Sequence, residues 1–407
     1  MKKLPGTRMH YGWMVAAVGC LCIFACLGLG RFAIGMLLPA MGEALHLSYS
    51  QMGLISTCNF LGYLAAVLVS GGVQARCGAR KLIFAALVLV GVSTALIGAA
   101  RSFPVVALLY ALTGIGSGAA NVSMMGLVTA WFNSRLRGRA AGFVVIGSGF
   151  AILLSGQIVP QLNALRPDGW RLSWFVLAGT VFVISIICWL VLRDRPQELG
   201  LGKVGDRAPG PSEPPRRIFL PLDRKAIYLC GVIYFIFGFT YVIYATFIVT
   251  VLVQEYNFSE QVAGTFWSAV GLLSLLSGPV FGTLSDRIGR RGGLMIVFSM
   301  QTVAYLLVGL RLEGAALALS IGCFGVVAWS IPSIMIALVG DLVGAQNTVR
   351  VFGLITFIFG LGQIAGPYVA GIMAEKTGSF AGAFIMAAVL TLTAVAVSSR
   401  LKVPKRG

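Results

Sequence analysis

One loop motif occurs twice in this chain, as Gly71-Gly-Val-Gln-Ala-Arg-Cys-Gly-Ala-Arg80 and as Gly282-Thr-Leu-Ser-Asp-Arg-Ile-Gly-Arg-Arg291, 211 residues apart. The same offset relates two further pairs, Arg139-Ala-Ala-Gly142 with Arg350-Val-Phe-Gly353, and Ser48 and Gly53 with Ser259 and Gly264. Three matches with one spacing indicate that a single structural unit has been duplicated.

The composition places both copies of this unit in a membrane. Hydrophobic residues make up 58% of the 407 residues and charged residues only 11%, against about 25% charged in a typical soluble protein. A helix that spans a bilayer needs about 20 mostly apolar residues. Twelve segments fit this requirement, at 12–38, 51–73, 82–100, 103–127, 139–163, 173–192, 226–253, 260–284, 292–311, 315–340, 350–374 and 380–399. The first is too long for a signal peptide, so we expect an uncleaved span.

The predicted fold class is therefore an all-α membrane protein with twelve transmembrane helices in two pseudo-symmetric six-helix halves. Residues 193–224 separate the halves, because six prolines and mixed charges interrupt the apolar pattern there. Such a composition is typical of a flexible linker. We expect an N-terminal half at 1–192, a cytoplasmic linker at 193–224 and a C-terminal half at 225–407. Two parallel repeats of this kind hold a ligand near the middle of the membrane, between the halves.

The distribution of basic residues predicts the orientation in the membrane. The net charge of +18 could suggest a nucleic-acid partner. However, 25 of the 31 Lys and Arg residues fall in the termini and in alternate loops on one side, and only five fall in the loops on the other. This is the positive-inside pattern, which places both termini in the cytoplasm. The surplus then reflects topology and contact with anionic membrane lipids, and we expect no nucleic-acid partner.

The loop motif at 282–291 resembles the signature of the major facilitator superfamily, in the form Gly282-x-x-x-Asp286-Arg287-x-Gly289-Arg290-Arg291. The first copy departs from it, with Ala75 where the family has Asp. Tyr110 stands where many members have Arg in span 4. Arg193-x-x-Pro196-x-Glu198-x-Gly200 is similar to segments of organic-anion and monocarboxylate branches. The resemblance covers essentially the whole chain and implies a secondary transporter, monomeric, in the bacterial cytoplasmic (inner) membrane.

The resemblance also implies gating residues. In the superfamily, the aspartate of the loop signature latches the cytoplasmic side against the start of a helix in the other half. Here the pseudo-symmetry points Asp286, with its neighbour Arg287, at the start of span 5, near Arg139. A helix start favours an anion because its backbone N–H groups are unpaired. Since Ala75 cannot accept a hydrogen bond, we expect closure to depend mainly on Asp286.

Arg31 is the only charged residue set deep in a long apolar segment, between Trp13-Met-Val-Ala…Leu-Gly30 and Phe32-Ala-Ile-Gly-Met-Leu-Leu38. Burying a cation in hydrocarbon costs a few kcal/mol or more, so such a residue suggests a functional site. No acidic residue lies in a comparable segment to neutralise it, and an anion that comes and goes would do so. A guanidinium binds a carboxylate through two parallel hydrogen bonds. The alternative is that Arg31 snorkels to the outer face or pairs with helix carbonyls.

Six further polar or aromatic residues are candidates for the substrate cavity. Asn59 and Tyr63 share one helix face in span 2, and an amide such as that of Asn121 in span 4 would be costly in lipid. Aromatic rings with a polar tip can wall a cavity and still form hydrogen bonds. The full set of predicted substrate-binding residues is Arg31, Asn59, Tyr63, Asn121, Tyr241, Tyr244 and Gln363. Interhelical hydrogen bonding and core packing are the alternative roles for each of them.

The mode of coupling stays open at this stage. All thirteen acidic residues lie in loops or at span ends, which disfavours a buried carboxylate relay for protons. Proton symport through the substrate, exchange for a counter-anion and facilitated diffusion all remain. The eight cysteines show no disulfide or zinc pattern, so we expect neither a metal nor a cofactor. No nucleophile or base cluster indicates an enzyme.

The sequence thus predicts a secondary active or facilitative transporter of a small organic anion, most simply a carboxylate, that works by alternating access. The alternative is an exporter of neutral or zwitterionic drug-like compounds. A cationic drug would favour an embedded acid, which the spans lack. A receptor without transport activity would be expected to carry an appended soluble domain.

Overall fold

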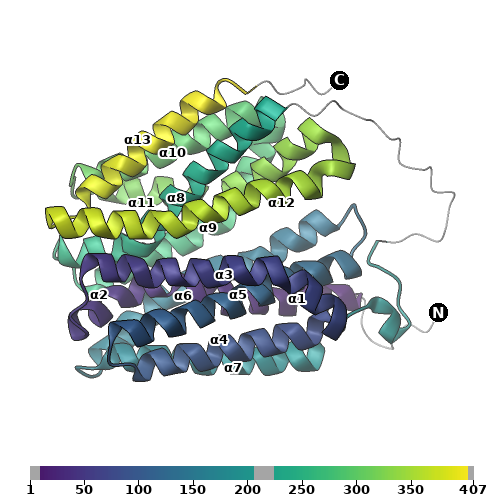
Figure 1. The fold of residues 1–407 in the computed structure, drawn as a ribbon, viewed down its shortest axis with the longest axis horizontal. Coiled ribbons are helices and arrows are strands. Elements are labelled where there is room, and N and C mark those ends of the chain that lie inside the picture. The colour runs from purple at the N-terminus through teal and green to yellow at the C-terminus, as the bar shows by residue number, and fades with distance from the viewer. Residues whose placement is uncertain (1–9, 206–223, 402–407) are drawn as a thin grey trace.

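The computed structural model describes residues 10–205 and 224–401, which are almost entirely helical. In chain order its elements are α1 Tyr11–Ile23, η1 Phe24–Phe32, α2 Ile34–Ala44, α3 Tyr49–Cys77, α4 Ala79–Ala99, α5 Phe103–Trp131, α6 Arg137–Ala164, α7 Gly169–Val191, η2 Pro196–Leu199, α8 Arg224–Gln254, α9 Glu260–Ile288, α10 Arg290–Gly309, α11 Ala315–Val327, α12 Ser330–Thr377 and α13 Ala381–Ser398. Figure 1 shows two bundles lying side by side, with α1 to α7 in one and α8 to α13 in the other.

These helices form twelve membrane-length apolar spans, which confirms the predicted number. The first span is composite, because α1, η1 and α2 run continuously over Tyr11–Ala44. The predicted end at residue 38 was too early, since the helix continues through Pro39. At the other extreme, α12 holds parts of two spans, and the chain turns between them at Gly344, whose φ of 73° is outside the helical region. Glycine adopts that φ without strain.

The first part of the predicted linker packs against the N-terminal half. Val204 donates its backbone N–H to the carbonyl of Trp131 at 2.9 Å, and its own carbonyl accepts from Asn133 at 3.2 Å. Residues 193–205 therefore follow a defined path along the end of α5. The remainder of the predicted linker, 206–223, lies outside the described residues.

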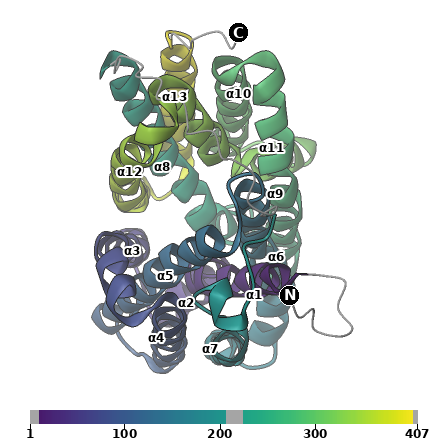
Figure 2. The same cartoon turned by 90° about the vertical axis from the view of Figure 1, so that its right-hand side faces the viewer.

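Helices α3 and α12, and likewise α6 and α9, pair across the two halves. One end of the bundle carries the loops around Gly78 and Gly289 together with residues 10 and 401, and we call it the terminus end. The other, the far end, carries the loops around residues 46, 257 and 378. Figures 1 and 2 show that the described chain begins and finishes at the terminus end.

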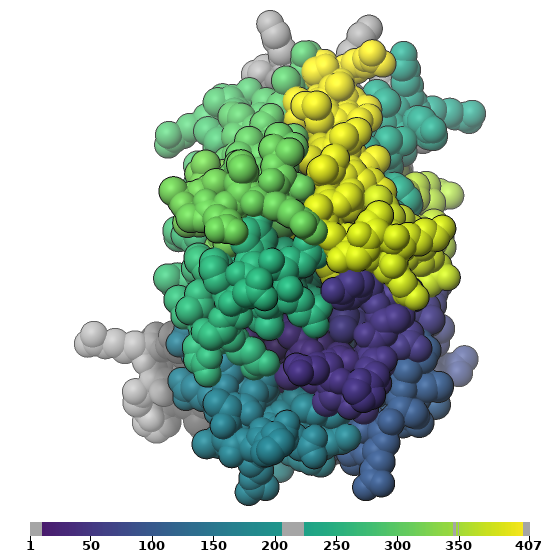
Figure 3. Space-filling view, turned by 90° about the vertical axis from the view of Figure 1, so that its left-hand side faces the viewer, coloured from purple at the N-terminus to yellow at the C-terminus, as the bar shows by residue number. Residues whose placement is uncertain are grey.

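At the far end the two halves are joined by hydrogen bonds. Glu375 accepts from the Ser48 hydroxyl at 2.9 Å and from the Ser50 backbone N–H at 3.0 Å. Asn163 donates its side-chain amide to Glu260 at 2.8 Å. These two contacts lie at pseudo-symmetric places, between α3 and α12 and between α6 and α9. Figure 3 shows this end with residues of both halves in direct contact.

Glycines at the interface of the halves are tightly packed near the far end and loosely packed near the terminus end. A side chain on Gly156 would collide with the carbonyl of Gly264 across the halves, and one on Gly53 would collide with that of Pro367. Nearer the terminus end, Gly142 and Gly282 of the same helix pair have no neighbouring atom within 4 Å of such a side chain. The halves therefore touch closely at the far end and part toward the terminus end, as expected for one state of a rocking carrier.

Gly156→Val is expected to prevent closure of the far end, because the new side chain occupies the space of the Gly264 carbonyl. Spin labels on Arg166 and Lys376 of a variant without other reactive cysteines report the distance between the halves there. We expect Gly156→Val to shift that distance distribution to longer values. Gly179→Val on α7, which meets no atom within 4 Å, is the matched control and should leave it unchanged. Equal distributions in the two variants would contradict the assigned packing.

Candidate functional site

Arg31 lies near the end of a π-helical stretch within the first span, η1. In a π-helix the N–H groups bond five residues back, as the Ala33 N–H does to the Gly28 carbonyl at 3.0 Å. Such stretches are rare in proteins overall, and those that occur are often found at functional sites. Two hydroxyls from α5 bond to its carbonyls, that of Ser117 to Cys26 at 2.6 Å and that of Tyr110 to Arg31 at 2.8 Å. Helix α5 thus stabilises the irregular backbone that carries Arg31.

The guanidinium of Arg31 is enclosed by aromatic rings. Its central carbon lies 4.1 Å from the ring centre of Phe60, 4.4 Å from that of Tyr63 and 5.8 Å from that of Phe32. Contacts of this kind attract a cation by about 2 kcal/mol when water is excluded. Arg31 is 6% exposed, so the side chain does not snorkel to water.

Part of the hydrogen-bonding capacity of the guanidinium is unused, at two of its three nitrogens. Its Nε and Nη2 atoms are buried and have no hydrogen-bond partner, and no ion pair within residues 10–205 and 224–401 includes Arg31. The helix carbonyls therefore do not bind these two atoms. A buried charged donor without a partner is costly, and an anion would satisfy it.

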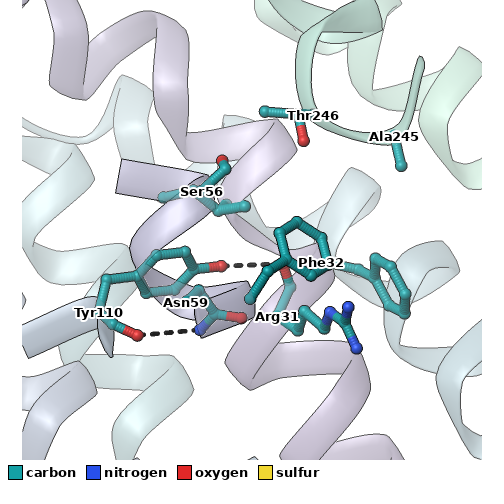
Figure 4. Close-up of a pocket in the computed structure, with 9 residues that line it drawn as sticks. Arg31, Phe32, Ser56, Asn59, Tyr110, Ala245 and Thr246 are labelled. Atoms are coloured by element: carbon teal, nitrogen blue, oxygen red, sulfur yellow. Dashed lines mark hydrogen bonds between the residues drawn. The ribbon is translucent and has the colours of Figure 1, made fainter. Parts of the chain in front are cut away.

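A small cavity adjoins the guanidinium at the interface of the two halves. Arg31, Phe32, Asn59 and Tyr110 line one side, and Ala245 and Thr246 of α8 line the other (Figure 4). Two oxygens in this lining, Ser56 Oγ and Asn59 Oδ1, are also buried without partners. The cavity offers about 10 Å³ to the centre of a water molecule, roughly enough for one water. The space next to the guanidinium in this structure is therefore small.

Beyond the residues that line this cavity, the second half also places a group of aromatic rings near Arg31. Tyr241 stacks on Phe237 at 4.9 Å, and its hydroxyl accepts a hydrogen bond from Gln363. Trp329 lies 5.7 Å from the Tyr241 ring and 5.1 Å from Phe32 of the first half. Arg31 lies within electrostatic range of Tyr241. The ring of Trp329 therefore connects the Arg31 surroundings to the second half.

The predicted cavity residues divide into those near Arg31 and one that is elsewhere. Tyr63 lies against the guanidinium and accepts a hydrogen bond from the Asn121 amide at 2.7 Å. Asn59, Tyr241 and Gln363 belong to the same region. Tyr244 does not, because its ring stacks on Phe324 at 3.9 Å and its hydroxyl bonds to Ser320 inside the second half. We therefore leave Tyr244 out of the candidate site.

The predicted gating residues lie at the terminus end. Asp286 forms an ion pair with Arg290, whose Nε also lies 3.1 Å from Asp341. Arg287 is exposed, and so is Arg139 in the first turn of α6. In this state Asp286 therefore pairs with the first residue of α10, the helix that follows its own.

Sequence reasoning missed Tyr110 and Phe60 as parts of the site. In the sequence, Tyr110 stands out only because many members of the superfamily have Arg at this position of span 4. In the structure, its hydroxyl donates a hydrogen bond to the backbone carbonyl of Arg31. Phe60 lies among apolar neighbours in span 2, and no local pattern marks it. Nothing in the sequence of η1 distinguishes a π-helix from an α-helix, because tertiary contacts decide between them.

The comparisons with known proteins identify the family of this chain. The family model described as an uncharacterised MFS-type transporter, YbfB, matches residues 23–399. The chain therefore belongs to this MFS-type transporter family, and it is a membrane transporter of twelve spans.

The chain is similar in sequence to two transporters and in fold to a solved structure. The chain is 25% identical to the hexuronate transporter of Bacillus subtilis, over 90% of this chain and 89% of the relative. It is 26% identical to a probable sulfoacetate transporter, SauU, of Cupriavidus necator, over 94% and 92%. A bacterial homologue of the lysosomal transporter Spinster, solved inward-facing and unoccupied, superposes with a TM-score of 0.72 at 16% identity, over 97% and 95% of the two chains.

Tyr110→Phe is expected to lower the free energy of unfolding by about 1 kcal/mol, because it removes the hydrogen bond to the Arg31 carbonyl. Tyr305→Phe is the matched control, since the Tyr305 hydroxyl is buried with no partner and its loss should not destabilise. Thermal unfolding in detergent measures both. A Tyr110→Phe variant as stable as Tyr305→Phe would show that this hydrogen bond does not support η1.

Proposed function

We propose that this protein carries a small organic anion, most simply a carboxylate, across the bacterial inner membrane by alternating access. The observation that carries the proposal is the buried guanidinium of Arg31, whose Nε and Nη2 have no partner. It lies at the interface of two halves that rock about their shared centre in carriers of this architecture.

A carboxylate fits this site for a geometric reason. Its two oxygens can accept two parallel hydrogen bonds from the planar guanidinium. The aromatic rings around Arg31 attract the cation but cannot accept N–H hydrogen bonds as strongly as an ionised oxygen can. Hexuronate and sulfoacetate, which the names of two relatives specify, are both organic anions, and this supports the same class for the present chain.

The arrangement of the halves corresponds to one step of the transport cycle. The far end is closed by the Glu375 and Asn163 hydrogen bonds, and the helices part toward the terminus end. From the positive-inside pattern we expect the terminus end to face the cytoplasm. With that orientation, the proposed cycle includes this structure as the state closed to the outside, in which the cavity next to Arg31 has space for about one water.

Arg31→Met is expected to weaken carboxylate binding about a hundredfold or more, because truncating one member of a buried charge pair costs 2–5 kcal/mol. Arg31→Lys keeps the charge but loses the planar fork, so we expect a loss of about tenfold. Titration calorimetry with a panel of small carboxylates on the purified full-length protein measures both. The exposed Arg101→Met is the control and should bind as the wild type does.

Stability separates a functional role of Arg31 from a structural one. If the guanidinium is kept for ligand binding, Arg31→Met should melt at or above the wild-type temperature, because a buried charge without a partner is removed. Unchanged carboxylate binding in Arg31→Met and Arg31→Lys would refute the proposal. A large loss of stability in Arg31→Met without ligand would assign the residue to folding.

Asp286 is proposed to latch the terminus end when that end closes. In the present state it is paired with Arg290, and closure would bring it to the exposed start of α6 near Arg139. Asp286→Asn should therefore slow transport in proteoliposomes several-fold while carboxylate affinity in detergent stays within about twofold. Asp168→Asn, at an exposed aspartate of the far end, is the control. Transport at the wild-type rate in a well-folded Asp286→Asn protein would contradict the proposed role of Asp286 as a latch.

A further inference from the structure

We propose that Trp329 is a substrate-contacting residue of the second half, and that the substrate is a carboxylate with a second hydrogen-bond acceptor, such as a hydroxyl or keto oxygen. This inference rests on the proposed function, since it places the carboxylate at Arg31. It adds the group that the second half recognises. Three observations carry it: a break in a helix, two ring contacts and an unused donor.

Trp329 lies at the break between α11, which ends at Val327, and α12, which begins at Ser330. Its φ of −114° and ψ of 16° are not helical. Ser277 of α9 holds this break, because its hydroxyl accepts the Trp329 backbone N–H at 3.1 Å and its carbonyl accepts the Ser330 hydroxyl at 3.0 Å. Interrupted helices near mid-membrane are the elements that form binding sites in many carriers. The π-helical η1 is a second helical irregularity, in the other half.

The Trp329 ring contacts the surroundings of Arg31 directly. It lies 5.1 Å from the ring of Phe32, the residue after Arg31 and part of the cavity lining. It also lies 5.7 Å from the ring of Tyr241. The two helix irregularities therefore meet across the interface of the halves, through Phe32 and Trp329.

The indole Nε1 of Trp329 is buried and has no hydrogen-bond partner. A buried Trp N–H usually has one, and leaving it unpaired costs about 1–3 kcal/mol. Trp170, Trp174 and Trp267 also have buried Nε1 atoms without partners, and Trp329 differs from them by its place at a helix break against Phe32. By contrast, the hydroxyl of the neighbouring Tyr241 is already bonded to Gln363.

The two unused donors define the chemistry of the ligand. Indole N–H can only donate, so the group opposite it must accept a hydrogen bond. Arg31 requires an anionic oxygen, and an uncharged oxygen is enough for Trp329. Because the cavity holds about one water in this state, the Phe32 and Trp329 rings must separate to admit a ligand, which then lies between the two donors.

The test uses matched ligands that differ by one hydroxyl. Butyrate and hexanoate are compared with their monohydroxy derivatives, with the hydroxyl at each carbon in turn, by titration calorimetry on the full-length protein. We expect the wild type to bind at least one hydroxy acid about three- to tenfold more tightly than its parent, the value of one added hydrogen bond. Trp329→Phe keeps a ring but removes the N–H, and should reduce that ratio to within twofold with little change in the affinity for the parent acid.

Trp170→Phe is the matched control, because it removes an equally unpartnered indole N–H from the far-end pocket beside Glu43 and Glu260. It should keep the wild-type ratio. Should Trp329→Phe fold poorly by its melting temperature, Trp329→Met replaces it in the same comparison. Equal binding of parent and hydroxy acids by the wild type, or an unchanged ratio in the variant, overturns the inference and leaves the proposed function intact. Binding of none of these acids overturns both.

Discussion

The physical constraint at the centre of this structure is a buried cation, Arg31, with two nitrogens that have no hydrogen-bond partner. Arg31 lies in the first half, in a span with no acidic residue before Glu43, and its Nε and Nη2 have no partner. Three aromatic rings hold the guanidinium in place, and hydroxyls of α5 hold its backbone in a π-helix. The anion site that we propose is therefore buried, and tight helix packing elsewhere must offset the cost of burying its charge. The cavity between the halves is the place where that cost can be recovered on binding.

The two halves share a fold and differ in their charges. The position related to Arg31 by the 211-residue repeat is Val242, so only the first half carries a cation at this position. The loop signatures differ as well. In the second half, Arg290 lies between Asp286 and Asp341.

The loop of the first half has Ala75 at the position that corresponds to Asp286. Another aspartate, outside the repeated motif, holds this loop in place. Asp194, just after α7, accepts the backbone N–H of Arg80 at 2.7 Å, and the Arg80 Nε donates to the Trp189 carbonyl. The loop at Gly78 is therefore anchored within its own half. The loop at Gly289 is anchored by Arg290 and its two aspartates, and the mobile latch that we propose belongs to this second loop.

Several features could be predicted from the sequence because they depend on local composition. Twelve apolar segments of membrane length predict twelve spans, since the bilayer leaves few alternatives for the backbone. The repeat at 211 residues predicts two related halves, and the isolated charge of Arg31 marks the candidate site. Asn59, Tyr63 and Asn121 could be placed near it, because amides and hydroxyls avoid lipid. The sequence did not show that Tyr241 lies near Arg31 and Tyr244 does not. The two residues are only three positions apart on one helix, but their side chains point in different directions.

The sequence by itself therefore determined the spans, the duplication and the isolated charge of Arg31 within a long apolar segment, because hydrophobic length and charge act locally along the chain. Only the tertiary structure decided that Arg31 is enclosed rather than snorkelling, that η1 is a π-helix and that Trp329 faces Phe32. It also decided which end of the bundle is closed, through contacts such as Glu375 with Ser48, 327 residues apart in sequence. These features depend on which faces of distant helices meet, and helix packing is set by the shapes of both partners together.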